Sequence, residues 1–427
     1  MAVRDARPYY DPRETVDPTT RHSNLEGKLR QAVRRAYLHA PATRAMMDRA
    51  GVQPRDVRTY HDLERLPISR KTDLIDLQKK QPPYGGLLTM AAVDVERVFI
   101  SPGPIYEPLH SSRIKWFAHA FWAAGFRKGD VVVNTFTYHL SPAGTLFHEA
   151  LRHCGATVVV TGTGNTDIQV QTMRDLHVTG FVGTPSFLVT VLKRAEEMGL
   201  NVRRDLALNK AWFTGEMLAP SIRKLLEIDY GVSTAQAYGV TEPGGCIAYE
   251  CAEKSGLHMM DDYFLEIVDP QTGKQLPPGK VGEIVVTPLH NRAWGLLRFG
   301  TGDLSSFTTK PCPCGRTAHR LTGILGRTAD AVKVRGMFVV ARQAEEAITA
   351  GGAVARYQIV VTRAAERDAL TLRAELKDET ADRPRTAQDI NARFQSACRV
   401  KIDRIEFIPA GTLPEKYQKV LDERRWD

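Results

Sequence analysis

The chain has 427 residues, 43% of them hydrophobic, and a formal net charge of +9 at pH 7. This composition is that of a globular protein with room for more than one domain. No apolar run approaches the ~18 residues of a membrane span, and the first residues, MAVRDARPYYDPRE, lack the apolar core of a signal peptide. We therefore expect a cytoplasmic protein with no membrane partner.

The positive charge suits anionic ligands such as nucleotides, and would also suit nucleic acid. The basic residues are mostly interleaved with acids, as in KRAEEMG and LDERRWD, so a solvated surface is expected and no nucleic-acid partner. Six cysteines in a cytoplasmic chain favour free thiols or a metal site over a disulfide framework.

The first hundred residues carry helical periodicity, for example in LEGKLRQAVRRAYLHA. From Asp130 onward, short β-branched runs alternate with helical segments. VVVNTF, ATVVVTG, TGFVGT and KAWFTG are predicted to be buried strands, and SFLVTVLKRAEEMG and APSIRKLLEIDYG amphipathic helices. This alternation predicts a parallel sheet covered on both faces, with ligands bound in the loops at the carboxyl ends of its strands.

From Phe264 the pattern changes to strands and turns, and FLEIVDPQTGKQLPPGKVGEIVVT predicts a hairpin. After a boundary near Gly326, RYQIVVT and ALTLRAEL predict a second hairpin, DINARFQSACRV a helix and RIEFIPA a strand. We therefore expect an α/β protein with a large domain over residues 1–326, including a β-rich subdomain, and a small α+β domain over residues 327–427.

Six short motifs occur in one order along this chain. They read SPGPIYEP (Ser101–Pro108), FTGEM (Phe213–Met217), QAYGVTEPGG (Gln236–Gly245), RFGTGDL (Arg298–Leu304), GRTADAVKVRG (Gly326–Gly336) and LPEKYQKV (Leu413–Val420). This order resembles the adenylate-forming superfamily of acyl- and aryl-CoA synthetases, and specifically its phenylacetate–CoA ligase branch.

The resemblance implies a reaction in two halves. A carboxylic acid, here expected to be aryl or arylacetic, reacts with ATP and Mg²⁺ to give an acyl-adenylate and pyrophosphate, and coenzyme A then displaces AMP. It also implies a C-terminal domain that is mobile, in a monomer or homodimer. Two rivals stay open: an enzyme that passes the acyl group to an amine or a carrier protein, and a non-catalytic nucleotide-binding homologue.

For the nucleotide, the resemblance implies that Tyr238 and Gly239 lie against adenine, that Thr241 binds the α-phosphate and that Glu242 binds Mg²⁺. A carboxylate suits that role because a hard divalent cation prefers oxygen ligands. The remaining implied nucleotide contacts are Gly215 and Glu216 at the adenine, Asp303 at the ribose, and Arg327 at the ribose or a phosphate.

Lys416 is implied as the catalytic lysine that bridges the acid and the α-phosphate during adenylation, with Lys419 as the alternative. After a rotation of the C-terminal domain, the KVRG segment is implied to serve the coenzyme A half-reaction, through Lys333, Arg335 and Gly336.

The first motif departs from the family pattern, which is rich in serine, threonine and glycine. Ser101 and Gly103 remain as expected nucleotide contacts, but two prolines remove backbone donors and Glu107 adds a negative charge. Either phosphate binding has shifted to other groups, or the chain does something else. We favour the first interpretation because every later motif survives.

Two further sites are expected. Cys251, His258, Cys312 and Cys314 form a ligand set typical of structural zinc, although buried thiols and a core histidine would look the same. An aromatic wall for the acid is expected from Phe136, Tyr138 and His139, closed by Gly244, although such a cluster is often plain core. The other cysteines are expected in the core: Cys154, Cys246 and Cys398.

Overall fold

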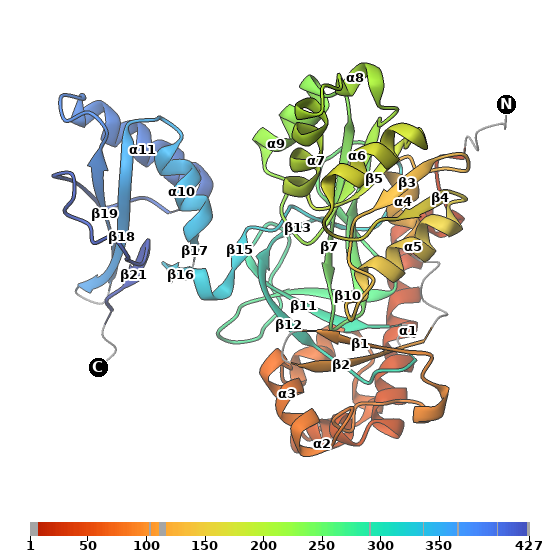
Figure 1. The fold of residues 1–427 in the computed structure, drawn as a ribbon. Coiled ribbons are helices and arrows are strands. Elements are labelled where there is room, and N and C mark those ends of the chain that lie inside the picture. The colour runs from red at the N-terminus through yellow and green to blue at the C-terminus, as the bar shows by residue number, and fades with distance from the viewer. Residues whose placement is uncertain are drawn as a thin grey trace. The chain divides into compact units, whose positions relative to one another are not determined.

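The computed structural model describes residues 7–101, 104–110, 117–289, 292–335, 337–364, 367–398 and 400–424 (Figure 1). The chain divides into two compact units. The first comprises Met1–Glu266, Val285–Thr301 and Phe307–Gly323, and the second Ile267–Ile284, Gly302–Ser306 and Ile324–Asp427. None of the helices in the described part of the chain combines the length and hydrophobicity needed to cross a bilayer.

The first unit begins with helices, which confirms the helical prediction for the N-terminal hundred residues. The Asp17 carboxylate caps α1 by accepting hydrogen bonds from two backbone N–H groups of the first turn. The α-helices are α1 (Pro18–His39), α2 (Pro41–Arg49) and α3 (Lys71–Lys80), and the 3₁₀ helices are η1 (Pro12–Thr15), η2 (Pro54–Asp56), η3 (Tyr60–Arg65) and η4 (Ala92–Asp94). A separate antiparallel pair follows, formed by β1 (Arg97–Ser101) and β2 (Ile105–Leu109).

A nine-stranded sheet is the centre of the first unit, in the order β13-β14-β9-β8-β7-β6-β5-β3-β4. The strands are β3 (Val131–Asn134), β4 (Thr157–Val160), β5 (Gly180–Gly183), β6 (Lys210–Phe213), β7 (Ser233–Val240), β8 (Gly245–Glu250), β9 (Leu257–Met259), β13 (Phe307–Thr308) and β14 (Arg320–Leu321). Strands β3, β4, β5, β6 and β7 pair in parallel, which confirms the prediction. The other half of the sheet, β7-β8-β9-β14-β13, pairs antiparallel.

Helices cover both faces of the parallel half, as the side chains of β6 show. Trp212 packs against Phe121 and Phe147, whereas its neighbour Phe213 belongs to the apolar cluster that contains Leu188. The helices of this region are α4 (Ala118–Ala123), α5 (Ala143–His153), α6 (Thr166–Asp175), α7 (Pro185–Glu197), α8 (Val202–Asp205), α9 (Pro220–Lys224) and the π-helix η6 (Leu225–Asp229).

The prediction that the strand in ATVVVTG is buried is wrong. Strand β4 forms, but it is the edge of the sheet, and the Val160 side chain is 57% exposed. A run of three valines does not show how many neighbouring strands β4 acquires, because an edge position depends on strand order.

A four-stranded sheet has the order β10-β11-β12-β15. Its strands are β10 (Tyr263–Val268), β11 (Gly282–Pro288), β12 (Phe299–Ser305) and β15 (Gly326–Arg327). The adjacency of β10 and β11 confirms the predicted hairpin. Immediately before β12, the buried Arg298 makes two hydrogen bonds to the Glu266 carboxylate, at 2.9 and 3.1 Å, and a third to the Leu66 carbonyl oxygen at 2.7 Å.

Arg298→Met is expected to destabilise the first unit by about 3–5 kcal/mol, because it leaves the Glu266 carboxylate buried and uncompensated. Thermal unfolding followed by circular dichroism measures the effect. Arg194→Met is the matched control, since Arg194 pairs with Asp167 at the exposed surface, and it should leave the midpoint nearly unchanged. Equal midpoints for the two variants would show that the buried pair does not stabilise the fold.

The second unit contains a four-stranded sheet in the order β20-β19-β18-β21 and a two-stranded sheet. The antiparallel pairing of β18 with β19 confirms the second predicted hairpin, and the predicted helix and following strand also form. The elements are η7 (Thr328–Asp330), β16 (Ala331–Val334), β17 (Met337–Val340), α10 (Ala341–Thr349), β18 (Val354–Ala364), β19 (Arg367–Leu376), α11 (Arg383–Cys398), β20 (Arg404–Ile408) and β21 (Val420–Asp422). The domain boundary after Gly326 stays a prediction.

Candidate active site

The first motif lies at the turn of the β1–β2 hairpin, where Ser101 pairs with Ile105. The Ser101 hydroxyl donates a hydrogen bond to Oε1 of Glu107, at 2.6 Å. Burial is the largest influence on this carboxyl and raises the pKa of Glu107 to about 7. The full negative charge that the sequence suggested is therefore reduced by partial protonation near neutral pH. Gly103 lies outside the described residues.

The QAYGVTEPGG motif forms the end of β7 and the turn into β8. Tyr238 is buried in β7, and the Gly244 N–H donates to the Thr241 carbonyl oxygen at 2.9 Å to close the turn. Gly245 has a positive φ, and a Cβ there would lie 2.7 Å from the Phe117 ring, so only glycine fits. This turn buries the Glu242 side chain without covering it completely.

Glu242 has a partner that the sequence did not reveal. Nζ of Lys71, at the first residue of α3, lies 2.9 Å from Oε1 of Glu242. The ammonium is nearly half exposed, with 44% of the side-chain surface accessible. The structure therefore brings a cation next to the carboxylate that the family resemblance assigns to Mg²⁺.

Loops that follow three parallel strands meet, as the sheet topology predicts. After β6, a Cβ on Gly215 would lie 3.8 Å from the ring of Phe136, which follows β3, and 4.0 Å from the methyl group of Thr184, which follows β5. The Ser186 hydroxyl, in the first turn of α7 after Thr184, donates to the Glu216 carboxylate at 2.6 Å.

The other predicted acid-pocket residues lie in different surroundings. The Tyr138 hydroxyl accepts a hydrogen bond from the Asn134 side-chain amide at 2.9 Å, which holds the ring over the end of β3. His139 is exposed, and its backbone N–H bonds to the Thr137 hydroxyl. Among the described residues, Phe136 is the one of the three whose ring lies beside Gly215.

Asp303 and Arg327 face each other on neighbouring strands of the second unit. They are paired in the register of β12 and β15, and Nε of Arg327 lies 3.3 Å from Oδ1 of Asp303. Because the guanidinium is mostly exposed, this pair remains accessible to a ligand. The structure therefore brings together two residues to which the resemblance assigns contacts with the nucleotide.

The two candidate lysines of the C-terminal motif differ in their contacts. Lys416 is exposed in the loop between β20 and β21. Nζ of Lys419 pairs with Oε1 of Glu345 at 2.5 Å and also lies over the Tyr357 ring. Lys419 is therefore held by its own unit, whereas no ion pair to Lys416 occurs within the described residues.

The KVRG segment is only partly described. Arg335 has a positive φ of 50°, and its Nε donates to the Asp368 carbonyl oxygen at 3.0 Å, while the guanidinium also pairs with Asp403. Gly336 and the side chain of Lys333 lie outside the described residues. An Arg335 that bound coenzyme A would have to leave these acidic partners.

The four predicted metal ligands come together, from the end of β8, from β9 and from the loop before β14. Their ligand atoms all lie within 4.8 Å of one another: Cys251, His258, Cys312 and Cys314. The sulfurs of Cys251 and Cys312 are 3.8 Å apart, which is about the spacing that tetrahedral zinc with 2.3 Å bonds requires. This donor set fits zinc.

Neighbouring groups set the orientation and protonation of these four ligands. His258 must donate from Nδ1 to the Ala318 carbonyl oxygen, 3.3 Å away, which leaves Nε2 free to face the Cys314 sulfur at 3.4 Å. Burial lowers the pKa of His258 to about 4, so the ring is neutral. Burial also raises the pKa of Cys251 to about 12, and a bound cation would reverse that effect by stabilising the thiolate. Cys154, Cys246 and Cys398 are buried, as expected for core cysteines.

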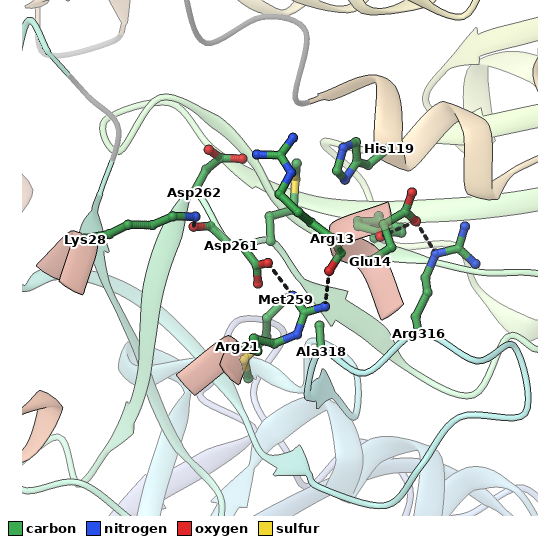
Figure 2. A pocket seen from close by; sticks show the side chains of 12 residues that line it. Arg13, Glu14, Arg21, Lys28, His119, Met259, Asp261, Asp262, Arg316 and Ala318 are labelled. Carbon is green, nitrogen blue, oxygen red and sulfur yellow. Dashed lines mark hydrogen bonds and ion pairs between the residues drawn. The ribbon is translucent and has the colours of Figure 1, made fainter. Parts of the chain in front are cut away.

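A charged cavity is lined in part by Ala318, whose carbonyl oxygen bonds to His258 (Figure 2). Its volume of about 30 Å³ admits about two waters, which is too small for an organic acid. Its walls include ion pairs that join the N-terminal helices to loops next to β9 and β14, namely Arg21 with Asp261 and Arg316 with Glu14. We interpret this cavity as a structural feature.

Sequence reasoning missed Lys71 and Ser186 as neighbours of predicted site residues. Lys71 begins an ordinary amphipathic helix 171 positions before Glu242, and a lysine there carries no motif. Ser186 follows the predicted strand TGFVGT closely, but no motif indicated its hydrogen bond to Glu216.

Comparisons with known proteins agree with this geometry. Residues 109–289 match the AMP-binding enzyme family and residues 336–424 the AMP-binding enzyme C-terminal domain. A phenylacetate–coenzyme A ligase of Thermus thermophilus is 33% identical over 96% of this chain and 98% of its own, and one of Pseudomonas putida is 31% identical over 87% and 86%. A crystal structure of 2-hydroxyisobutyryl-CoA ligase in an open conformation, with 2-HIB-AMP and CoA, superposes with a TM-score of 0.90 at 25% identity, covering 98% of this chain and 95% of that one. The chain thus belongs to the phenylacetate–CoA ligase family of adenylate-forming, AMP-forming acid–thiol ligases.

Proposed function

We propose that this protein joins an aryl or arylacetic acid to coenzyme A, by forming an acyl-adenylate from the acid and ATP and then transferring the acyl group to the thiol. The observation that carries the proposal is the full-length similarity to phenylacetate–coenzyme A ligases together with the survival of the later motifs in one order. Relatives that act on arylacetic acids are more similar in sequence than the 2-hydroxyisobutyryl-CoA ligase structure.

The contact between Phe136 and Gly215 supports an aromatic substrate. The Phe136 ring is half-buried and packs edge-on against Phe147, which leaves it as a fixed apolar surface beside the small Gly215. An aryl acid could stack on such a ring and gain apolar burial. We propose that Tyr138, His139 and Gly244 complete the pocket.

The nucleotide roles extend the same proposal. Tyr238, Gly239, Gly215 and Glu216 bind adenine, Thr241 and Ser101 bind phosphate, and Asp303 and Arg327 bind ribose. A buried carboxylate is an apt ligand for Mg²⁺, and Glu242 is the residue that would hold it. When bound, the cation would neutralise part of the phosphate charge. The glycines of the turn would let the protein backbone approach the nucleotide closely.

Lys416 is proposed to enter the site during adenylation, since an exposed ammonium without an ion pair in the described residues can move to developing negative charge. Arg335, Lys333 and Gly336 are proposed for the coenzyme A half-reaction. The zinc ion proposed at the cysteine–histidine cluster would be structural, because all four tetrahedral positions are filled by the protein.

A panel of acids tests the substrate class. Benzoic, phenylacetic, indoleacetic and 2-hydroxyisobutyric acids are each incubated with MgATP, with and without coenzyme A, and acyl-CoA is measured by mass spectrometry. We expect acyl-CoA from an aryl or arylacetic acid, and AMP release that stops near one turnover when coenzyme A is omitted. Product from 2-hydroxyisobutyric acid alone would contradict the aromatic assignment.

A further inference from the structure

The Glu107 carboxyl is an unusual group for the turn that should bind phosphate. Glu107 is only 6% exposed. Its Oε1 accepts a hydrogen bond from the Ser101 hydroxyl. No donor in the described part of the chain reaches Oε2. A buried oxygen without a partner is unfavourable because it has lost its hydration, so this position calls for an explanation by a bound group.

Two charged neighbours indicate what that group is. Glu242 is close enough to Glu107 to repel it electrostatically, and Lys71 is close enough to attract it. Lys71 also pairs directly with Glu242, at 2.9 Å. Two carboxylates from distant parts of the chain therefore influence each other, and the half-exposed Lys71 ammonium interacts with both of them.

The fold holds these groups in place. The Gln78 side chain of α3 binds both backbone groups of Tyr106 on β2, donating to its carbonyl oxygen at 2.8 Å and accepting from its N–H at 2.9 Å. Tyr106 is the neighbour of Glu107, and Lys71 begins the helix that carries Gln78. The hairpin and the helix are thus joined so that Glu107 and Lys71 keep their places beside Glu242.

We propose that Glu107 and Glu242 together bind the divalent cation that accompanies ATP, and that Lys71 balances the two carboxylates when the cation is absent. Two carboxylates suit a hard divalent cation, and the extra positive charge next to the phosphates replaces the donors that the prolines of the first motif remove. Phosphate binding thereby depends more on the metal than in a glycine- and serine-rich loop. This inference rests on the proposed ligase activity, but it concerns a site that can be measured without turnover.

Mn²⁺ binding, followed by electron paramagnetic resonance with and without α,β-methylene-ATP, tests the proposal. Glu107→Gln keeps size and a hydrogen-bonding group but loses charge, and it should weaken Mn²⁺ binding by about tenfold or more. Lys71→Met removes the competing ammonium and should strengthen binding without nucleotide several-fold, about the effect of removing one close charge. Glu149→Gln, on α5 and paired with Arg97 of the same hairpin, is the control and should bind as the unmodified protein does.

The opposite signs of the two variants separate a cation site from misfolding, which would weaken both. Unchanged Mn²⁺ affinity in Glu107→Gln overturns the proposal and favours a protonated Glu107 that donates a hydrogen bond to phosphate. Weaker binding in Lys71→Met overturns the role given to the lysine. If no acid gives acyl-CoA yet the Mn²⁺ results hold, the ligase assignment fails while the cation site stands.

Discussion

Replacing Lys416 by alanine is expected to slow acyl-adenylate formation by about a hundredfold or more, the effect of removing one donor to developing negative charge. Thioester formation from a supplied acyl-adenylate and coenzyme A should continue, because the resemblance assigns the lysine to the first half-reaction only. Single-turnover pyrophosphate release measures the first half-reaction, and acyl-CoA formation from synthetic acyl-adenylate measures the second.

The loop that carries Lys416 is held at both ends. Nη1 of Arg356 donates to the Leu413 carbonyl oxygen at 2.7 Å, and the Leu413 N–H donates to the Glu375 carboxylate at 2.7 Å. These bonds hold the start of the loop. On its far side, the Gln358 side chain donates to the Gln418 carbonyl oxygen at 3.1 Å, and the Ile359 N–H donates to the Lys419 carbonyl oxygen at 2.8 Å. The lysine side chain between these two ends stays exposed. Lys416 is therefore positioned by the backbone and free to reach a ligand.

Lys419→Ala is the matched control for this experiment, since it removes an ammonium from the same loop. Because Lys419 is engaged by Glu345, its replacement should leave both half-reactions near their original rates. A loss of adenylation in Lys419→Ala but not in Lys416→Ala would reverse the assignment. Survival of both half-reactions in both variants would remove the C-terminal loop from the mechanism.

The second large effect is expected at the cysteine–histidine cluster. The purified protein should contain about one zinc per chain, and Cys314→Ser should lower zinc affinity by about a hundredfold or more, because even outer-shell changes cost 10- to 100-fold. Structural zinc binding contributes folding free energy directly, so the thermal midpoint should fall together with the zinc content. Zinc is measured by inductively coupled plasma mass spectrometry and unfolding by circular dichroism.

The N-terminal segment explains why the loss should spread beyond the four ligands. The Tyr9 hydroxyl donates to the Cys314 carbonyl oxygen at 3.0 Å, and Arg316 pairs with Glu14 at 2.5 Å. Both contacts depend on the loop that zinc would fix. Cys154→Ala, a buried cysteine outside the cluster, should keep its zinc. A protein that contains no zinc and melts at the same temperature with or without a chelator would restore the alternative of plain buried thiols.

The parallel strands could be predicted because continuous Val, Phe and Trp runs are typical of strands buried on both faces. The edge position of β4 could not be predicted, because strand order depends on pairing between distant segments and not on the composition of Thr157–Val160. The convergence of the three loops followed from topology, since the carboxyl ends of parallel strands share one edge.

The electrostatic environment of the site was the part that could least be predicted from the sequence. The sequence displays Glu107 and Glu242 as acids, but the burial that raises the pKa of Glu107 and the pairing of Lys71 with Glu242 exist only in three dimensions. Arg298 likewise looks like a motif residue, and its bonds to Glu266 make it a structural one. Charges that are distant in sequence acquire their roles from the fold.

ATP–pyrophosphate exchange tests the central claim, that this chain forms acyl-adenylates despite its altered first motif. The protein is incubated with MgATP, labelled pyrophosphate and an aryl or arylacetic acid, and incorporation of label into ATP is measured. Acid-dependent exchange without coenzyme A is the predicted result. No exchange with any acid, in a protein that still binds ATP, would contradict the claim and indicate a nucleotide-binding homologue without ligase activity.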